Sequence, residues 1–193
     1  MFKLTRYSGN PIFSPSPDFP WEKEGVLNPG VIDTGEEIIM LYRAVGERQS
    51  YTSHIGLAKS KDGIHFERAS KEPVFGPKEI FDKYATEDPR ITKIDNDYYV
   101  TYVAVPDPIL LDGKEVVRDK PLETSVALLK TKDFLNYENL GIITAPCSDN
   151  KDVVLFPRKI NGRYAMLHRP NHWNKLWCRT SFEKSPEDRL LCA

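Results

Sequence analysis

The stretch FPRKINGRYAMLH, residues 156–168, places two runs of strand-forming residues on either side of an Asn-Gly pair. Asn-Gly is the strongest short-range signal for a β-hairpin, because both residues tolerate the positive φ that a tight turn needs. Two further stretches have the same form around Asp-containing turns, GVIDTGEEIIMLYR at 30–43 and RITKIDNDYYVTY at 90–102. Three hairpins of one design predict an all-β chain with an internal repeat.

A second unit alternates with the hairpins and consists of a strand, a Ser/Thr-Lys-Asp turn and a short strand with an aromatic residue. It is present as IGLAKSKDGIHFE at 55–67 and as VALLKTKDFLNYE at 126–138. The equivalent residues Arg43, Val103 and Arg169 are 60 and 66 positions apart. Four strands in about 60 residues are typical of one blade of a β-propeller, a fold with roughly 4 to 8 blades. A β-sandwich is the alternative, although a sandwich does not require the two units to alternate.

We therefore predict an all-β fold of the β-propeller type, in which this chain forms about three blades of four-stranded antiparallel sheet. Residues 1–170 would form the N-terminal part of the propeller. Residues 171–193 would form an atypical tail, because the alternation of strand and turn stops after Pro170. This tail is either an interrupted blade or a segment that arose from a frameshift. A long insertion at 106–121 is expected near the mouth of a ligand site.

The composition restricts the classes of partner. Of the 193 residues, 40% are apolar and 28% are charged, and the net charge is −1. This balance provides no bulk attraction for nucleic acid or for an anionic membrane. No apolar run approaches the ~18 residues that span a bilayer, so we expect a cytoplasmic protein with neither nucleic acid nor membrane as a partner. The scattered His and Cys residues lack ligand spacing, and neither a metal nor a cofactor is expected.

Polar residues gather near the start of each repeat. Asn28 lies 15 positions before Arg43, and Asp88 lies 15 positions before Val103, so these two residues occupy the same place in successive repeats. The comparable turn of the third repeat contains Asn-Lys-Asp at 150–152. Blades of a propeller surround a central channel, so equal places in different blades converge on its axis. Asn28 and Asp88 should therefore face one pocket.

Several motifs in this order resemble glycoside hydrolase family 130. They are NPG at 28–30, YRA at 42–44, EDPRI at 87–91, KD at 151–152 followed by LFP at 155–157, and LHRP at 167–170. Members of that family are five-bladed propellers, and most of them are inverting phosphorylases that cleave β-mannosides with inorganic phosphate. The resemblance covers residues 10–170, so this chain would hold about three-fifths of such a ring.

The resemblance implies that Asp88 is the catalytic acid. An inverting phosphorylase needs one acid to protonate the leaving oxygen, while phosphate replaces water as the nucleophile on the opposite face of the sugar. In the family this acid is thought to act through a sugar hydroxyl. Without the resemblance, the favoured interpretation of Asp88 is a residue that caps the turn before Pro89.

The resemblance also implies a phosphate site made of Lys151 and Arg169, which are 18 positions apart on adjoining strands. Phosphate binding needs fixed cations, and the planar fork of Arg meets phosphate oxygens bidentately. Inorganic phosphate would thus be a co-substrate. His168 is a further candidate for this site, although it alternates with Arg169 along the strand and could simply pack.

The sugar itself would be held by Arg43 and Asn28, again by resemblance. An amide suits sugar hydroxyls because it both donates and accepts hydrogen bonds. Glu87 and Arg90 flank the Asp88-Pro89 pair. They are expected either to pair and support Asp88 or to form a purely structural ion pair.

The predicted activity is phosphorolysis of β-1,4-mannosides, of the mannooligosaccharide or mannosylglucose type, to α-mannose 1-phosphate with inversion. One alternative is a β-mannosidase on the same fold, which needs a second carboxylate to activate water. A third hypothesis is an inactive carbohydrate-binding remnant, because an incomplete ring leaves sheet edges unpaired. The expected partners are a β-mannoside and phosphate, and assembly into a homo-oligomer is left open.

Overall fold

The computed structural model describes residues 3–108, 110–111, 113–116, 124–145, 148–173 and 191–192. None of these residues lies in a helix, so none belongs to a helix that could cross a membrane. The strands are β1 (Gly25–Asp33), β2 (Ile38–Val45), β3 (Ser53–Ser60), β4 (Glu67–Arg68), β5 (Ala85–Ile94), β6 (Asp97–Val105), β7 (Leu110–Leu111), β8 (Lys114–Glu115), β9 (Ser125–Thr131), β10 (Tyr137–Ile142), β11 (Ser148–Leu155), β12 (Ala165–Trp173) and β13 (Leu191–Cys192). The prediction of an all-β chain is confirmed for this part.

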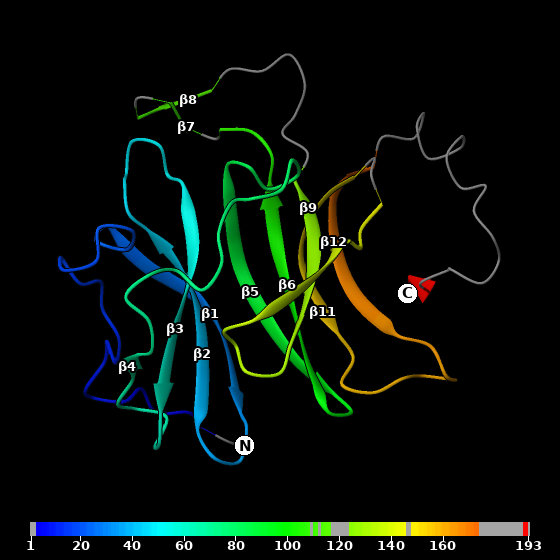
Figure 1. The fold of residues 1–193 in the computed structure, drawn as a ribbon, viewed down its shortest axis with the longest axis horizontal. Coiled ribbons are helices and arrows are strands. Elements are labelled where there is room, and N and C mark those ends of the chain that lie inside the picture. The colour runs from blue at the N-terminus through cyan, green and yellow to red at the C-terminus, as the bar shows by residue number, and fades with distance from the viewer. Residues whose placement is uncertain are drawn as a thin grey trace.

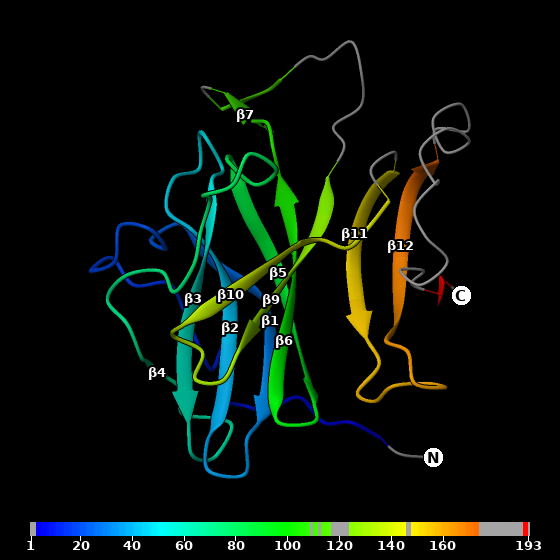
Figure 2. The ribbon, with the colours of Figure 1, turned by 45° about the vertical axis from the view of Figure 1, so that its right-hand side comes forward.

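Three main sheets lie side by side, coloured from blue through green to orange along the chain (Figures 1 and 2). Their strand orders are β1-β2-β3-β4, β5-β6-β9-β10 and β11-β12-β13, and β7 pairs with β8 in a small separate hairpin. β1 contacts β5, and β5 contacts β11. Each of these three strands lies at one edge of its own sheet, and we call them the inner strands because they face one another across the sheet boundaries.

Two apolar layers hold the three sheets together. Leu41 of β2 shares the first layer with Val100 and Tyr102 of β6, whereas Val103 of β6 shares the second layer with Val153 of β11. Successive residues of a strand point to opposite faces, so β6 buries one face in each layer. This burial on both faces explains why the sequence of the strand, DYYVTYVAV, is an almost unbroken run of apolar and aromatic residues.

Most of the predicted hairpins are confirmed. The stretches at 30–43 and 90–102 form β1–β2 and β5–β6, and the Lys-Asp units form β3–β4 and β9–β10. The hairpin predicted at 156–168 is displaced, because β11 ends at Leu155 and the Asn-Gly turn caps a loop. That loop closes through a bridge between Ile160 and Arg163, with positive φ at Asn161 and Gly162.

The third sheet differs from the predicted four-stranded antiparallel blade. In the described residues it has three strands, and β13 pairs with β12 in parallel. In the sequence, the alternation of strand and turn that would predict a second hairpin ends after Pro170. β12 itself continues to Trp173. The rest of the predicted tail (174–190 and 193), with residues 109, 112 and 117–121 of the predicted insertion, lies outside the described residues, and the domain boundary at 170 stays a prediction.

Buried acid–tyrosine pairs anchor the start of the first two inner strands. The Tyr42 hydroxyl donates to Glu22 Oε2 at 2.7 Å, and the Tyr102 hydroxyl donates to Asp82 Oδ2 at 2.7 Å. Arg68 Nε also donates to Glu22 Oε1, at 2.8 Å. Each acid lies three residues before its inner strand, so each pair ties the entry of that strand to its neighbour in the sheet.

A glycine allows β1 and β5 to approach each other closely. A Cβ atom at Gly30 would lie 2.5 Å from the carbonyl oxygen of Pro89 and 3.3 Å from Arg90 Cα. Both obstacles are backbone atoms, which cannot rotate away as a side chain can. The close contact between the two inner strands therefore requires glycine at this position.

Candidate active site

The same β-bulge recurs in all three inner strands. One extra residue follows Leu27 in β1, Glu87 in β5 and Lys151 in β11, because each inner strand advances three residues there while its partner advances two. A bulge of this kind bends the strand and redirects a side chain. The residue at the bulge has a positive φ in every case, 46° at Asn28, 51° at Asp88 and 56° at Asp152. Asn and Asp are the non-glycine residues that adopt this conformation most readily.

Asn28, Asp88 and Asp152 therefore occupy equivalent positions in three neighbouring strands. The equivalence of Asn28 and Asp88 agrees with the sequence analysis, which assigned residues 150–152 to the third position as a group. The structure singles out Asp152 from that group. It lies 17 rather than 15 positions before Arg169, because the loop between β11 and β12 is longer than the other two turns.

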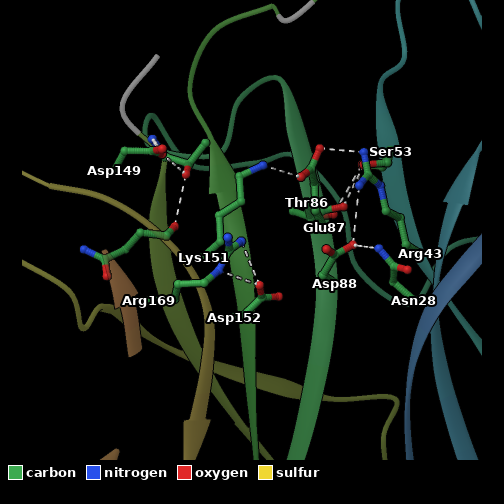
Figure 3. Close-up of polar contacts among 12 residues, drawn as sticks. Asn28, Arg43, Ser53, Thr86, Glu87, Asp88, Asp149, Lys151, Asp152 and Arg169 are labelled. Atoms are coloured by element: carbon green, nitrogen blue, oxygen red, sulfur yellow. Dashed lines mark hydrogen bonds and ion pairs between the residues drawn. The ribbon is translucent and has the colours of Figure 1, made fainter. Parts of the chain in front are cut away.

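The first group of contacts surrounds Asp88, whose side chain is 14% exposed. Asn28 Nδ2 donates to Asp88 Oδ1 at 2.9 Å, and Arg43 Nη1 lies 3.4 Å from the same oxygen. Figure 3 shows both side chains reaching Asp88 from the first sheet. The structure thus brings together the predicted acid and the two predicted sugar-binding residues.

Glu87 links this group to the third sheet. Its side chain is 2% exposed, and its two oxygens face different cations. Arg43 Nη2 lies 2.6 Å from Oε1, and Lys151 Nζ lies 3.4 Å from Oε2, so Glu87 bridges cations of two sheets (Figure 3). The prediction that Glu87 and Arg90 form an ion pair with each other is wrong, since each has other partners. The bulge between these two residues turns Arg90 toward β11, where it contacts Asp152 instead.

The second group of contacts is centred on Asp152. Arg90 Nη2 lies 3.0 Å from Oδ1, Arg169 Nε donates to Oδ2 at 3.1 Å, and Arg169 Nη2 forms an ion pair with Oδ2 at 2.9 Å. Lys151 and Arg169 are direct partners in the register of β11 and β12, so the two predicted phosphate-binding residues lie side by side. Their side chains are 29% and 58% exposed, which leaves both accessible to a ligand.

His168 has a different neighbour. Its Nδ1 atom lies 2.9 Å from Asn150 Oδ1. Adjacent residues of β12 point to opposite faces, so His168 projects away from the face that carries Arg169. This contact favours a packing role, and participation of His168 in phosphate binding stays a prediction.

Tyr51 is a site residue that the sequence analysis missed. The Arg43 guanidinium lies over its ring, 5.2 Å from the centroid, and Tyr51 itself has a φ of 59°. It lies in the loop between β2 and β3, where no alternation of polar and apolar residues indicates which way a side chain points. Its only sequence signal is its position two residues before β3, at the end of the sheet from which Arg43 reaches Asp88.

The described residues contain no group of three or more His, Cys, Asp or Glu side chains that could hold a metal ion. A hollow of about 600 Å³ lies at the free side of the first sheet, against β1 and β2. Its lining is mainly apolar and includes Phe13, Val31 and Met40, but not Asp88 or its partners. The chemistry of the chain is therefore concentrated at the bulges rather than in this hollow.

An acid flanked by an amide and an arginine on one side and by further cations on the other matches the needs of an enzyme that cleaves a glycosidic bond with an anionic partner. Comparison with known families agrees. The model of glycoside hydrolase family 130, described as beta-1,4-mannooligosaccharide phosphorylase, matches residues 3–187. The chain belongs to this family.

Three relatives illustrate the relationship. A beta-1,2-mannobiose phosphorylase of Thermoanaerobacter sp. (strain X514) is 37% identical in an alignment 188 residues long that covers 90% of this chain and 57% of the relative. A beta-1,4-mannooligosaccharide phosphorylase of Ruminococcus albus is 28% identical, over 87% of this chain and 47% of the relative. The structure of the beta-1,2-mannobiose phosphorylase from Listeria innocua in complex with beta-1,2-mannobiose is 27% identical, with a TM-score of 0.64 over 88% of this chain and 59% of that one. The chain thus spans about half the length of these curated relatives.

Proposed function

We propose that this chain carries the acid and phosphate half of a β-mannoside phosphorylase. One observation carries the proposal, namely that Asp88 contacts Asn28 and Arg43 while Lys151 and Arg169 lie on the neighbouring strands β11 and β12. A mannosyl unit bound by the first two residues would present its glycosidic oxygen to Asp88. Phosphate bound by the two cations would be the nucleophile.

In this mechanism a phosphate oxygen attacks the anomeric carbon as the bond to the leaving oxygen breaks. Asp88 supplies the proton that the leaving oxygen takes up, by way of a sugar hydroxyl, and solvent restores that proton after product release. The attack comes from the face opposite the leaving group, so a β-mannoside yields α-mannose 1-phosphate. Lys151 and Arg169 would hold the phosphate and offset the negative charge that the sugar phosphate retains.

Hydrolysis is the less well supported reaction. It needs a second carboxylate with a free oxygen to activate water. Asp152 contacts Arg169 and Glu87 contacts Lys151, and both oxygens of each of these acids already face cations. An acid that is engaged in this way is a poor general base, which favours phosphorolysis.

The linkage of the substrate is proposed from the relatives. The Thermoanaerobacter enzyme, named for β-1,2-mannobiose, is 37% identical, whereas the Ruminococcus enzyme, named for β-1,4-mannooligosaccharides, is 28% identical. We therefore propose β-1,2-mannobiose as the first substrate to test. The β-1,4 linkage predicted from the sequence is the second, supported by the description of the matching family model.

The same proposal includes the propeller. The three sheets meet at equivalent inner strands and carry equivalent bulges, which supports three blades of a five-bladed ring. The likeness to the Listeria innocua structure supports it as well. A cytoplasmic location belongs to the proposal too, from the composition alone.

The test is to incubate the chain with β-1,2- or β-1,4-mannobiose, with and without inorganic phosphate, and to follow sugar phosphate by ³¹P NMR. We expect α-mannose 1-phosphate, formed only when phosphate is present, and none from Asp88→Asn. Release of mannose at equal rates with and without phosphate would replace the proposal with a hydrolase. Sugar binding without turnover under either condition would replace it with a binding remnant.

A further inference from the structure

Arg90 is a cation that the proposed phosphate site does not yet include. It belongs to the same strand as Asp88 and follows it by two positions, directly after the bulge of β5. The equivalent positions in β1 and β11 are Gly30 and Val154, because each of these follows its own bulge. Among the three inner strands, β5 alone therefore presents a charged side chain at this level.

The contact with Asp152 shows where the Arg90 side chain lies. Arg90 Nη2 is 3.0 Å from Asp152 Oδ1, and Arg169 Nη2 is 2.9 Å from Oδ2 of the same carboxylate. Both guanidinium groups therefore lie beside the same carboxylate. Arg90 and Arg169 thus form a pair across the boundary between the second and third sheets.

Such a pair can bind a second anion. Two guanidinium groups carry two positive charges, and Asp152 offsets one of them. Each guanidinium has five N–H donors, of which Arg90 and Arg169 each use one in a hydrogen bond to Asp152. The side chains of Arg90 and Arg169 are 42% and 58% exposed, so both present donors to a ligand, whereas the Nε–H group of Arg90 is buried.

We propose that Arg90 is a phosphate-binding residue, which completes with Arg169 and Lys151 a three-cation site for the nucleophile. This inference rests on the proposed function. Phosphate would accept hydrogen bonds from both arginines on the side away from Asp152, while Asp152 holds the two guanidinium groups in place. Since Arg90 and Asp88 are two positions apart on one strand, the same short segment would hold the nucleophile and supply the proton.

The experiment compares Arg90→Gln and Arg90→Lys with the wild-type chain and with Arg158→Gln, an exposed arginine of the β11–β12 loop. Two quantities are measured, the phosphate-dependent rise in unfolding temperature and the separate KM values for phosphate and mannobiose. Arg90→Gln should raise the KM for phosphate about tenfold to a hundredfold, as expected for lost hydrogen bonds to a charged group. The KM for mannobiose and kcat at saturating phosphate should change by less than about threefold, since Arg90 is not among the proposed sugar-binding residues.

Arg90→Lys keeps the charge but loses the planar fork, so its KM for phosphate should fall between those of wild type and Arg90→Gln. Unfolding without phosphate reports the fold of each variant, and Arg90→Lys serves as the test if Arg90→Gln does not fold. Phosphate affinity equal to that of Arg158→Gln in a folded Arg90 variant would overturn this inference and leave the proposed function intact. Absence of any phosphate effect on the wild-type chain would overturn both.

Discussion

Asn28 in β1 donates its Nδ2 hydrogen to Asp88 Oδ1 in β5 at 2.9 Å, although the two residues are 60 positions apart in the chain. Both lie at a β-bulge with positive φ, in the same place of successive sheets. The repeat thus presents an amide and an acid to each other from equivalent positions. One unit of the repeat holds the proposed catalytic acid of the next.

The contact between Asn28 and Asp88 predicts a loss of activity in Asn28→Ala. Removing one hydrogen bond to a charged group costs about 1.5–3 kcal/mol, so kcat/KM for mannobiose should fall about tenfold to a hundredfold. Asn139→Ala is the matched control, because Asn139 Nδ2 also contacts an acid 60 positions away, Glu79, at the surface. Equal kinetics for the two variants would remove Asn28 from the site.

Asp88→Asn should abolish turnover without unfolding the protein. A positioned general acid contributes about 10²–10⁴-fold to the rate, and an amide cannot supply its proton. The Arg43 side chain keeps its 2.6 Å contact with Glu87, so the buried cation retains a partner. Steady-state rates and circular dichroism are measured together. The control Asp107→Asn, which changes an exposed acid beside Lys83, should behave as wild type. If Asp88→Asn kept more than about a tenth of the wild-type rate, the catalytic acid would have to be another residue.

Gly30→Ala should destabilise the fold. The new Cβ would lie 2.5 Å from the Pro89 carbonyl oxygen, and the resulting overpacking costs about 1–3 kcal/mol. Gly25→Ala is the control on the same strand, because its Cβ would lie an ordinary 3.7 Å from Leu27 Cδ2. Urea unfolding of both variants tests the difference. A stable Gly30→Ala protein would show that β1 and β5 are not in close contact.

The convergence of Asn28 and Asp88 could be predicted from the sequence because it depends on a spacing. Both residues lie 15 positions before the equivalent residue of the next strand, and the turns between these strands are short, with four and two residues. Asp152 does not have this spacing, because a longer loop separates β11 from β12. A single count along the chain cannot detect that two loop residues have been added between paired strands.

The ion pairs were harder to predict for another reason. Glu87 and Arg90 are close in sequence and opposite in charge, yet a bulge between them sends one side chain to Arg43 and the other to Asp152. A bulge changes which face a side chain occupies without changing the sequence of alternating residue types. The partners of Glu87 also come from two other sheets, so they depend on how the sheets pack.

Alkaline pH should destabilise the protein through Tyr42 and Tyr102. Burial, together with the hydrogen bond to Glu22, raises the pKa of Tyr42 well above its usual value, and burial with the bond to Asp82 does the same for Tyr102. The unfolded chain releases these protons near pH 10 while the folded chain retains them. Their contribution to stability is therefore fully present below about pH 10 and is lost as pH rises above it.

Above about pH 10, each tyrosine that stays protonated only in the folded chain lowers the free energy of unfolding by about 1.4 kcal/mol per pH unit. The double variant Tyr42→Phe/Tyr102→Phe should thus be less stable than wild type at pH 8, because Glu22 and Asp82 each lose a donor. Its stability should also decline less steeply between pH 10 and 11. Urea unfolding at pH 8, 9, 10 and 11 measures both effects, with the exposed Tyr7→Phe as control. Identical slopes for the double variant and for Tyr7→Phe would show that the two buried hydroxyls ionise as freely in the folded chain as in the unfolded one.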